Sequence, residues 1–194
     1  DHVLTTPFSF SSTASCAYRV GARPVFADIL PDTFNLDPEK IEAALTPRTR
    51  VVIPVHLFGQ CAEMDPILEI AERRGLAVLE DAAQAIGTEY RKRKVGASGN
   101  PVCFSFHPNK NMTTIEGGAV ASNDADFLDR LEQVRFHGID KDSEGNIDIV
   151  AWGGKMNLPD VNAAVGLAQL ARLDGFNRRR RELVQQYFQR LSAS

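Results

Sequence analysis

Short apolar segments alternate with helix-length segments through the first half of the chain, and this alternation constrains the fold more than any other feature. The predicted strands are residues 3–6, 24–28, 50–55 and 76–79, and the predicted helices are residues 11–20, a segment that opens at 37–39, and residues 64–74. Because these strands are apolar nearly throughout, helices must cover both faces of the sheet, as they do when crossovers join parallel strands. We therefore predict an α/β fold with a mostly parallel central sheet and helices on both faces, in which ligands bind at the carboxyl ends of the strands.

The middle of the chain departs from this alternation. Two more strands are predicted at 102–106 and 118–122, with a polar loop between them, and a helix is predicted at 124–135. Residues 136–156 are rich in Gly and Asp and have no periodicity. That composition predicts an ordered functional loop without regular structure.

Two predicted helices close the chain. The first, at 159–173, carries no charge in Val161–Ala171. A helix that is apolar nearly all round is expected to be buried or to lie at an interface. The second, at 177–191, is amphipathic.

The composition limits the classes of partner. With 43% hydrophobic and 24% charged residues among 194, the chain is globular in composition and long enough for a sizeable core. Its 22 basic and 25 acidic residues give a net charge of −3, so no positive field attracts nucleic acid or an anionic membrane. The longest apolar runs, such as Val51-Val52-Ile53, fall far short of the ~20 residues that span a bilayer. A small molecule is therefore the expected partner.

The cysteines and the first residues bear on location and completeness. Cys16, Cys61 and Cys103 are far apart and form no C-x-x-C pair, and no His lies at metal-ligand spacing from them. Reduced thiols, no metal and a cytoplasmic location fit this pattern best. The chain opens at Asp1 without an initiator Met or a signal pattern and enters a predicted strand at once. We therefore expect an internal piece of a longer protein, truncated at both ends.

Two polar motifs follow predicted strands. The first is Glu80-Asp81-Ala82-Ala83-Gln84, in which Asp81 lies where ligands bind in parallel sheets. The second runs from Phe104 to Asn111 and combines a hydroxyl, an imidazole, amides and the single lysine Lys110, ahead of Glu116-Gly117-Gly118. Taken alone, Asp81 fits an N-cap or turn residue, and Lys110 fits a solvated loop lysine.

Taken together, the two motifs resemble the DegT/DnrJ/StrS family of pyridoxal-phosphate-dependent nucleotide-sugar aminotransferases, which have fold type I. Further segments match the family in the same order, at residues 7–13, 55–59, 135–138, 156–164 and 168–173. The resemblance covers essentially the whole chain. It implies that residues 1–175 are the large cofactor-binding domain, incomplete at its N-terminus, and that residues 176–194 form a helix leading towards a missing small C-terminal domain.

The resemblance implies that two residues carry the chemistry. Lys110 would form the Schiff base with pyridoxal 5'-phosphate and later shuttle a proton, since a primary amine makes a reversible imine. Asp81 would pair with the pyridinium nitrogen and keep the ring protonated. A dehydratase branch of the family has His in place of the lysine, so the presence of Lys110 favours transamination.

The same resemblance implies residues that hold the cofactor. Phe10 would stack on the ring, Gln84 would hydrogen-bond the ring hydroxyl, and Ser105 would donate to the phosphate. Asn157 would reach the phosphate of the neighbouring subunit, so that a homodimer shares its two sites.

Other polar residues remain open between a functional and a structural role. His107 and His137 would line the sugar pocket, although a packed structural histidine explains each of them equally well. Arg178-Arg179-Arg180-Arg181 fits a solvated helix face better than a phosphate site. Gly117-Gly118 is expected to allow close backbone approach beneath the cofactor.

The implied function is transfer of an amino group from an amino acid, by family habit L-glutamate, to a keto group of a nucleotide-linked sugar. Such amino sugars serve surface polysaccharides or secondary metabolites. Two alternatives remain: a non-catalytic sensor or regulator that binds pyridoxal phosphate on the same scaffold, and a lysine-bearing relative with another reaction, such as sugar dehydration. The fragment alone is expected to lack part of the substrate pocket.

Overall fold

The structure is a computed structural model in which residues 1–192 are described. Its first sheet consists of β1 (His2–Thr5), β2 (Arg23–Phe26), β3 (Thr49–Val52) and β4 (Ala77–Val78). These strands lie in the order β2-β1-β3-β4, and every pairing between them is parallel. The predicted parallel sheet is therefore confirmed.

A second set of strands extends this layer. It consists of β5 (Glu80–Asp81), β8 (Val102–Ser105) and β9 (Gly118–Ala121), in the order β5-β8-β9. β5 pairs with β8 in parallel, and β9 runs antiparallel to β8. A bridge between Val55 and Asp81 joins β5 to the chain that leaves β3. The strand predicted at 76–79 is thus the shorter β4, and a separate short strand beyond the predicted range, β5, carries Asp81.

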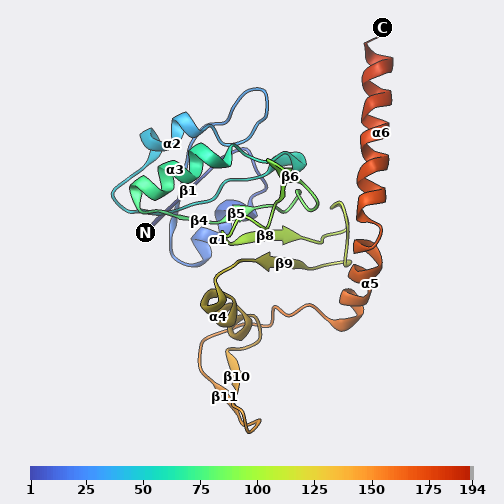
Figure 1. The fold of residues 1–194 in the computed structure, drawn as a ribbon. Coiled ribbons are helices and arrows are strands. Elements are labelled where there is room, and N and C mark those ends of the chain that lie inside the picture. The colour runs from blue at the N-terminus through green and yellow to red at the C-terminus, as the bar shows by residue number, and fades with distance from the viewer. Residues whose placement is uncertain (193–194) are drawn as a thin grey trace.

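Helices cover both faces of the sheet, as predicted (Figure 1). They are α1 (Ser12–Arg19), α2 (Pro38–Ala44) and α3 (Met64–Arg74). On one face, Leu4 and Val52 pack with Ile41 of α2 and Ile67 of α3. On the other face, their chain neighbours pack with α1, in a cluster formed by Val3, Ile53 and Ala17. Successive strand residues point to opposite faces, so a run that is apolar on both faces has to be covered twice.

The caps explain where two of these helices begin and end. The Asp37 side chain accepts a hydrogen bond from the Glu39 backbone N–H at 2.9 Å, and Pro38 occupies the first turn of α2. Gly75 adopts a left-handed conformation, with φ of 63°, and ends α3. Both signals are visible in the sequence.

The remaining elements lie around this layer. They are a 3-10 turn, η1 (Leu57–Gly59), a small hairpin of β6 (Glu89–Tyr90) and β7 (Arg93–Lys94), α4 (Ala125–Arg135), a hairpin of β10 (Ile139–Lys141) and β11 (Ile147–Ile149), α5 (Asp160–Leu170) and α6 (Leu173–Leu191). In Figure 1, α6 is a long rod beside the sheet that extends past it at one end, and the β10–β11 hairpin extends at the other.

The prediction of an irregular loop at 136–156 is wrong for its central part. β10 and β11 form an antiparallel hairpin there. The Asp142 side chain closes the turn by accepting from the backbone N–H groups of Glu144 and Asn146, both at 2.9 Å. Strands of three residues are too short to show a period in the sequence, so the hairpin escaped prediction.

The two last helices meet earlier than predicted. α5 ends at Leu170 and α6 begins at Leu173, so Gly175 lies inside α6 instead of breaking it. A glycine costs about 1 kcal/mol in an exposed helix, which a 19-residue helix tolerates. The proposed boundary between residues 175 and 176 therefore falls within one continuous helix, and residues 193–194 of the second segment lie outside the described residues.

The uncharged helix is not buried within this chain. Val161, Leu167 and Leu170 of α5 are all more than half exposed. Of the two expectations for this helix, burial is excluded here and an interface remains a proposal. Among the described residues, no helix is both long enough and apolar enough to cross a membrane.

Candidate active site

Asp81 lies at the carboxyl end of β5 and is held through both its backbone and its side chain. Its backbone N–H donates to Pro54 at 2.9 Å, and its carbonyl accepts from the His56 N–H at 2.9 Å. Its Oδ1 accepts from the Ala83 N–H at 3.1 Å, and its Oδ2 accepts from the Thr13 hydroxyl at 2.7 Å. The carboxylate is therefore fixed in orientation at the edge where ligands bind in such sheets.

Glu80, the preceding residue, is the centre of a buried polar network. Its carboxylate accepts from His56 Nε2 at 2.9 Å, from Ser98 Oγ at 2.8 Å and from Asn100 Nδ2 at 3.0 Å. The His56 and Glu80 side chains are 0% and 2% exposed. His56 Nδ1 accepts from the Ala62 N–H at 3.2 Å, which assigns the ring proton to Nε2. His56 therefore donates to Glu80 through Nε2.

The network determines the charge state of Glu80. Burial alone raises the pKa of the Glu80 carboxyl, but the hydrogen bonds from His56, Asn100 and Ser98 outweigh burial and hold that pKa below its ordinary value. Glu80 is thus an ionised, fully paired carboxylate next to Asp81 in β5.

Gln84 lies one turn beyond Asp81 and bonds to the η1 segment. Its Oε1 accepts from the Phe58 backbone N–H at 2.7 Å, and Phe58 has a φ of 56°. Among the described residues, no hydrogen bond uses the Gln84 amide nitrogen. That NH₂ group is thereby left to donate to a ligand.

The loop after β8 carries Lys110. Its backbone N–H donates to the His107 carbonyl at 2.9 Å, and the His107 ring bonds to Asn109 Oδ1 at 2.8 Å. Ser105 Oγ accepts from the His107 N–H at 3.4 Å. Lys110 is half-buried, and within residues 1–192 its amine makes no ion pair or hydrogen bond. The loop thus presents an amine that is not committed to another side chain.

Gly117 and Gly118, the two glycines after Glu116, lie in close contact with other residues of this chain. A Cβ at Gly118 would lie 2.6 Å from the Phe104 carbonyl oxygen, and one at Gly117 would meet Thr114 Oγ1 and lie 2.7 Å from Leu158. The predicted close backbone approach is present, but its physical reason is this packing of β9 against β8 and the loop.

Two of the other residues predicted for the site, Phe10 and His137, are exposed. Phe10, in the loop between β1 and α1, is 75% exposed. His137 stacks edge-on to Phe136 at 5.3 Å, and in the described part of the chain no hydrogen bond or ion pair joins it to another predicted site residue. Asn157 is half-buried, and its Oδ1 is a buried polar atom without a hydrogen-bond partner among the described residues.

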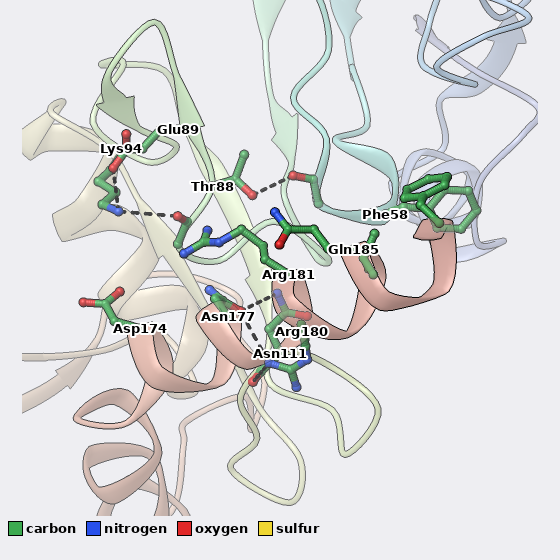
Figure 2. Close-up of a pocket in the computed structure, with 14 residues that line it drawn as sticks. Phe58, Thr88, Glu89, Lys94, Asn111, Asp174, Asn177, Arg180, Arg181 and Gln185 are labelled. Carbon is green, nitrogen blue, oxygen red and sulfur yellow. Dashed lines mark hydrogen bonds and ion pairs between the residues drawn. The ribbon is translucent and has the colours of Figure 1, made fainter. Parts of the chain in front are cut away.

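A cavity of about 920 Å³ lies between α6 on one side and η1 and the β6–β7 hairpin on the other, next to the lysine loop (Figure 2). Asn111, the residue after Lys110, bonds through Nδ2 to Asn177 Oδ1 at 3.2 Å, and Arg180 Nη1 donates to the Asn111 carbonyl at 3.3 Å. Arg180 and Arg181 line this cavity. All four residues of the run 178–181 are nevertheless exposed, as expected for a solvated arginine face, and Arg179 pairs with Glu182 at 3.0 Å.

Burial keeps two of the three thiols protonated. It raises the pKa of Cys61 to about 12 and that of Cys103 to about 11, and nearby carboxylates, foremost Glu80 for Cys61 and Asp81 for Cys103, add to the shift. Within residues 1–192, no group of three or more His, Cys, Asp and Glu side chains is arranged to hold a metal ion.

Sequence reasoning missed the residues that support Asp81. Thr13 lies in a segment that matches the family, and His56 lies in another, but neither pattern states what its side chain contacts. Glu80 stands next to Asp81 and belongs to the same motif. A buried-strand position occupied by an acid is itself a signal, because such a group has to be paired.

Comparison with known proteins agrees with this geometry. The model of the DegT/DnrJ/EryC1/StrS aminotransferase family matches residues 1–194. The spore coat polysaccharide biosynthesis protein SpsC of Bacillus subtilis (strain 168) is 45% identical over 195 residues, which is 96% of this chain and 50% of SpsC.

Solved structures give the same result. DesV of S. venezuelae, in complex with a ketimine intermediate, superposes with a TM-score of 0.92 at 37% identity, over 97% of this chain and 50% of DesV. Spr1654 of Streptococcus pneumoniae, a protein named as a putative sugar aminotransferase, was solved in its PLP-form. It superposes with a TM-score of 0.92 at 29% identity, over 100% of this chain and 54% of Spr1654.

The α/β layer, with a carboxylate at the end of one strand and a lysine loop after its neighbour, matches about half of each of these structures. The chain belongs to the DegT/DnrJ/EryC1/StrS aminotransferase family. It spans about half the length of the relatives that it matches.

Proposed function

We propose that this chain is the cofactor-binding part of a pyridoxal-phosphate-dependent aminotransferase that acts on a nucleotide-linked keto-sugar. One observation carries the proposal. Asp81 ends β5, and the Lys110 loop follows β8, which pairs with β5 in parallel register, with Asp81 opposite Cys103. Neighbouring parallel strands end at the same edge of a sheet, so the carboxylate and the uncommitted amine belong to one site.

The residues present fit the proposed cofactor. Asp81 supplies an anionic acceptor for a ring N–H, Gln84 supplies a free amide donor, and Ser105 supplies a hydroxyl. Phe10 offers an exposed ring for stacking. Asn157 carries a side-chain amide whose Nδ2 would donate to the phosphate of the neighbouring subunit, while its Oδ1 is a buried acceptor without a partner among the described residues. Asp81, Gln84 and Ser105 thus each have a chemical counterpart on pyridoxal 5'-phosphate.

The chain's own groups divide the work as follows. The bound cofactor would supply an electron sink for the carbanion formed when a substrate loses its proton. Asp81 would accept the hydrogen bond from the ring nitrogen and keep that nitrogen protonated. The Lys110 amine would hold the cofactor and carry the proton between two carbon positions. Gln84 and Phe10 would fix the plane of the ring.

The substrate class rests on the relatives. DesI has been solved with its TDP-sugar product, and PseC of Helicobacter pylori takes part in the biosynthesis of pseudoaminic acid. By analogy, this protein would aminate a nucleotide-linked keto-sugar for a surface polysaccharide or secondary metabolite, with L-glutamate as the amino donor. A cytoplasmic location suits such soluble substrates. His107, which bonds within the lysine loop, is a candidate for contact with the sugar, and so is His137.

We further propose a homodimer with shared sites. α5 has no charge between Val161 and Ala171 and exposes its apolar side chains, and Asn157 lies just ahead of it. Stable interfaces of this kind are apolar at their centre. Residues 1–175 would form the large domain, and residues 176–194 would lead into a small domain.

The test uses the full-length protein. Incubated with pyridoxal 5'-phosphate, L-glutamate and a panel of nucleotide-linked keto-sugars, it should release 2-oxoglutarate and one amino sugar in equal amounts. Cofactor binding without amino transfer to any of the sugars would favour a sensor. A deoxygenated sugar formed without 2-oxoglutarate would favour dehydration. The absence of any cofactor adduct would overturn the proposal.

A further inference from the structure

The first turn of α1 makes a direct contact with Asp81. Thr13, in the first turn of α1, donates its hydroxyl to Asp81 Oδ2 at 2.7 Å across 68 positions of sequence. Ser9 Oγ lies 2.8 Å from Thr13 Oγ1. Thr13 is only 5% exposed, so this contact is shielded from water.

The hydrogens in this chain of contacts can be assigned. An ionised carboxylate only accepts, so the single Thr13 hydroxyl hydrogen points at Asp81. Thr13 Oγ1 then has no hydrogen left for Ser9, and Ser9 must donate to Thr13. The direction runs from Ser9 to Thr13 to Asp81, and each donor polarises the next.

The Thr13 hydroxyl could instead have donated to a nearby backbone carbonyl. A threonine within a helix commonly donates to a carbonyl three or four residues earlier, or to solvent. Thr13 instead donates to a carboxylate on another strand, so the contact is tertiary and specific. Charge-assisted hydrogen bonds of this type are short and directional.

The two donors to Asp81 restrict the carboxylate from both sides. The Ala83 N–H holds Oδ1 at 3.1 Å and Thr13 holds Oδ2 at 2.7 Å. Each carboxylate oxygen accepts about two hydrogen bonds, so acceptor capacity remains for one further N–H. Without the Thr13 hydroxyl, the carboxylate loses a donor and is free to rotate about its last torsion.

We propose that Thr13, supported by Ser9, is a positioning residue that aims the Asp81 carboxylate at the ring nitrogen of the cofactor. The inference rests on the proposed function for the identity of that cofactor. The loop just ahead of α1 carries Phe10, so residues 9–13 set both the face of the ring and the direction of its nitrogen partner.

The experiment compares two threonine-to-valine variants of the full-length protein. Thr13→Val removes the hydroxyl and keeps the volume. Thr5→Val is the matched control, because Thr5 is also buried and donates one hydrogen bond, at 2.8 Å, to the Ile53 carbonyl instead of to Asp81. Each apoprotein is titrated with pyridoxal 5'-phosphate by absorbance, and its melting temperature is recorded.

We expect Thr13→Val to weaken cofactor binding about ten-fold, to change the visible spectrum of the bound cofactor, and to lower kcat about ten-fold with KM nearly constant. Thr13→Ser should restore all three properties. Thr5→Val should lower the melting temperature and leave cofactor affinity and spectrum unchanged. Ser9→Ala should give a smaller change in the direction of Thr13→Val.

Two results would overturn the inference. One is a Thr13→Val protein with wild-type cofactor affinity and spectrum. The other is an equal loss of affinity in Thr13→Val and Thr5→Val, since that would reduce Thr13 to a packing residue. Cofactor affinity is measured without a sugar substrate. The inference about Thr13 can therefore be tested even if the protein transfers no amino group to any sugar.

Discussion

The sheet and the last quarter of the chain differ in how their apolar side chains are buried. In the sheet, helices cover both faces and the side chains of Leu4, Ile41 and Ile67 are fully buried. In the last quarter, Trp152 is 100% exposed and Leu167 is 71% exposed. Exposed apolar side chains that recur along one segment mark a surface meant for contact. The chain therefore combines a sheet whose core is buried within the chain with a last quarter whose apolar surface points outward.

The largest expected effect tests whether the chemistry belongs to the sheet region. Lys110→Ala in the full-length protein should abolish the adduct that borohydride traps with pyridoxal phosphate and reduce turnover to background, because no other amine in the loop can replace it. Mass spectrometry of tryptic peptides gives the position of the adduct. A trapped adduct on Lys92, Lys94 or Lys155 would contradict the assignment.

The next effect concerns the second group of the same site. Asp81→Asn keeps the size of the side chain but loses its charge, so the ring nitrogen is no longer held protonated. Cofactor should still bind, and turnover should fall about 100-fold or more. Steady-state kinetics beside an absorbance titration separate the two properties. Turnover close to that of the wild type would reduce Asp81 to a turn residue.

A matched pair of substitutions sharpens the contrast in burial. Ile67→Ala removes a fully buried side chain and should lower the free energy of unfolding by about 2–5 kcal/mol. Leu167→Ala removes an exposed one and should change the intrinsic stability of the subunit little, while weakening association between subunits. Urea unfolding and sedimentation measure the two quantities. Equal destabilisation without a change in association would remove the distinction between the regions.

Subunit complementation asks whether the exposed segment completes a neighbour's site. Equal amounts of Lys110→Ala and Asn157→Ala protein, each inactive, are mixed under conditions that allow exchange. Half of the dimers are then mixed, and one of the two sites in each mixed dimer has both residues intact, so roughly a quarter of the wild-type activity should return. An active monomer in sedimentation would refute the shared site. A dimer without complementation would move Asn157 to its own subunit's site.

The same contrast explains what the sequence could predict. α3 was predicted at its observed bounds, because its apolar spacing and Gly75 are local signals. The β10–β11 hairpin was not, because its strands have three residues each and their side chains remain mostly exposed. The periodic spacing of apolar residues in a sequence reflects which side chains are buried. A segment that buries few side chains within the chain therefore shows little periodicity.

The site likewise has residues that the sequence could predict and contacts that it could not. Asp81, Gln84, Ser105 and Lys110 could be named because they stand in short motifs. The bond from Thr13 to Asp81 and the bond from His56 to Glu80 join residues 68 and 24 positions apart. Such pairings depend on which strands become neighbours, and a single sequence does not state that.

The smallest expected effect is the pH dependence contributed by Glu80. Its pKa is lowered in the fold, so folding favours its ionised form. The resulting stability is fully present above the unfolded pKa of a glutamate, about 4.3, and is lost as the pH falls from there through the folded pKa. In Glu80→Gln full-length protein, unfolding free energies measured in urea between about pH 6 and pH 3 should therefore fall less steeply than in the wild type.

Glu89 supplies the matched control for that measurement. Its pKa is also lowered, by a hydrogen bond and the charge of Lys94 at 2.8 Å, but its carboxylate is on the surface, where solvent screens the pair. Glu89→Gln should therefore leave the pH slope nearly unchanged. Equal slopes for Glu80→Gln and the wild type would mean that the donors around Glu80 do not hold it ionised. In that case the buried network beneath Asp81 would contribute packing and orientation but no pH-dependent stability.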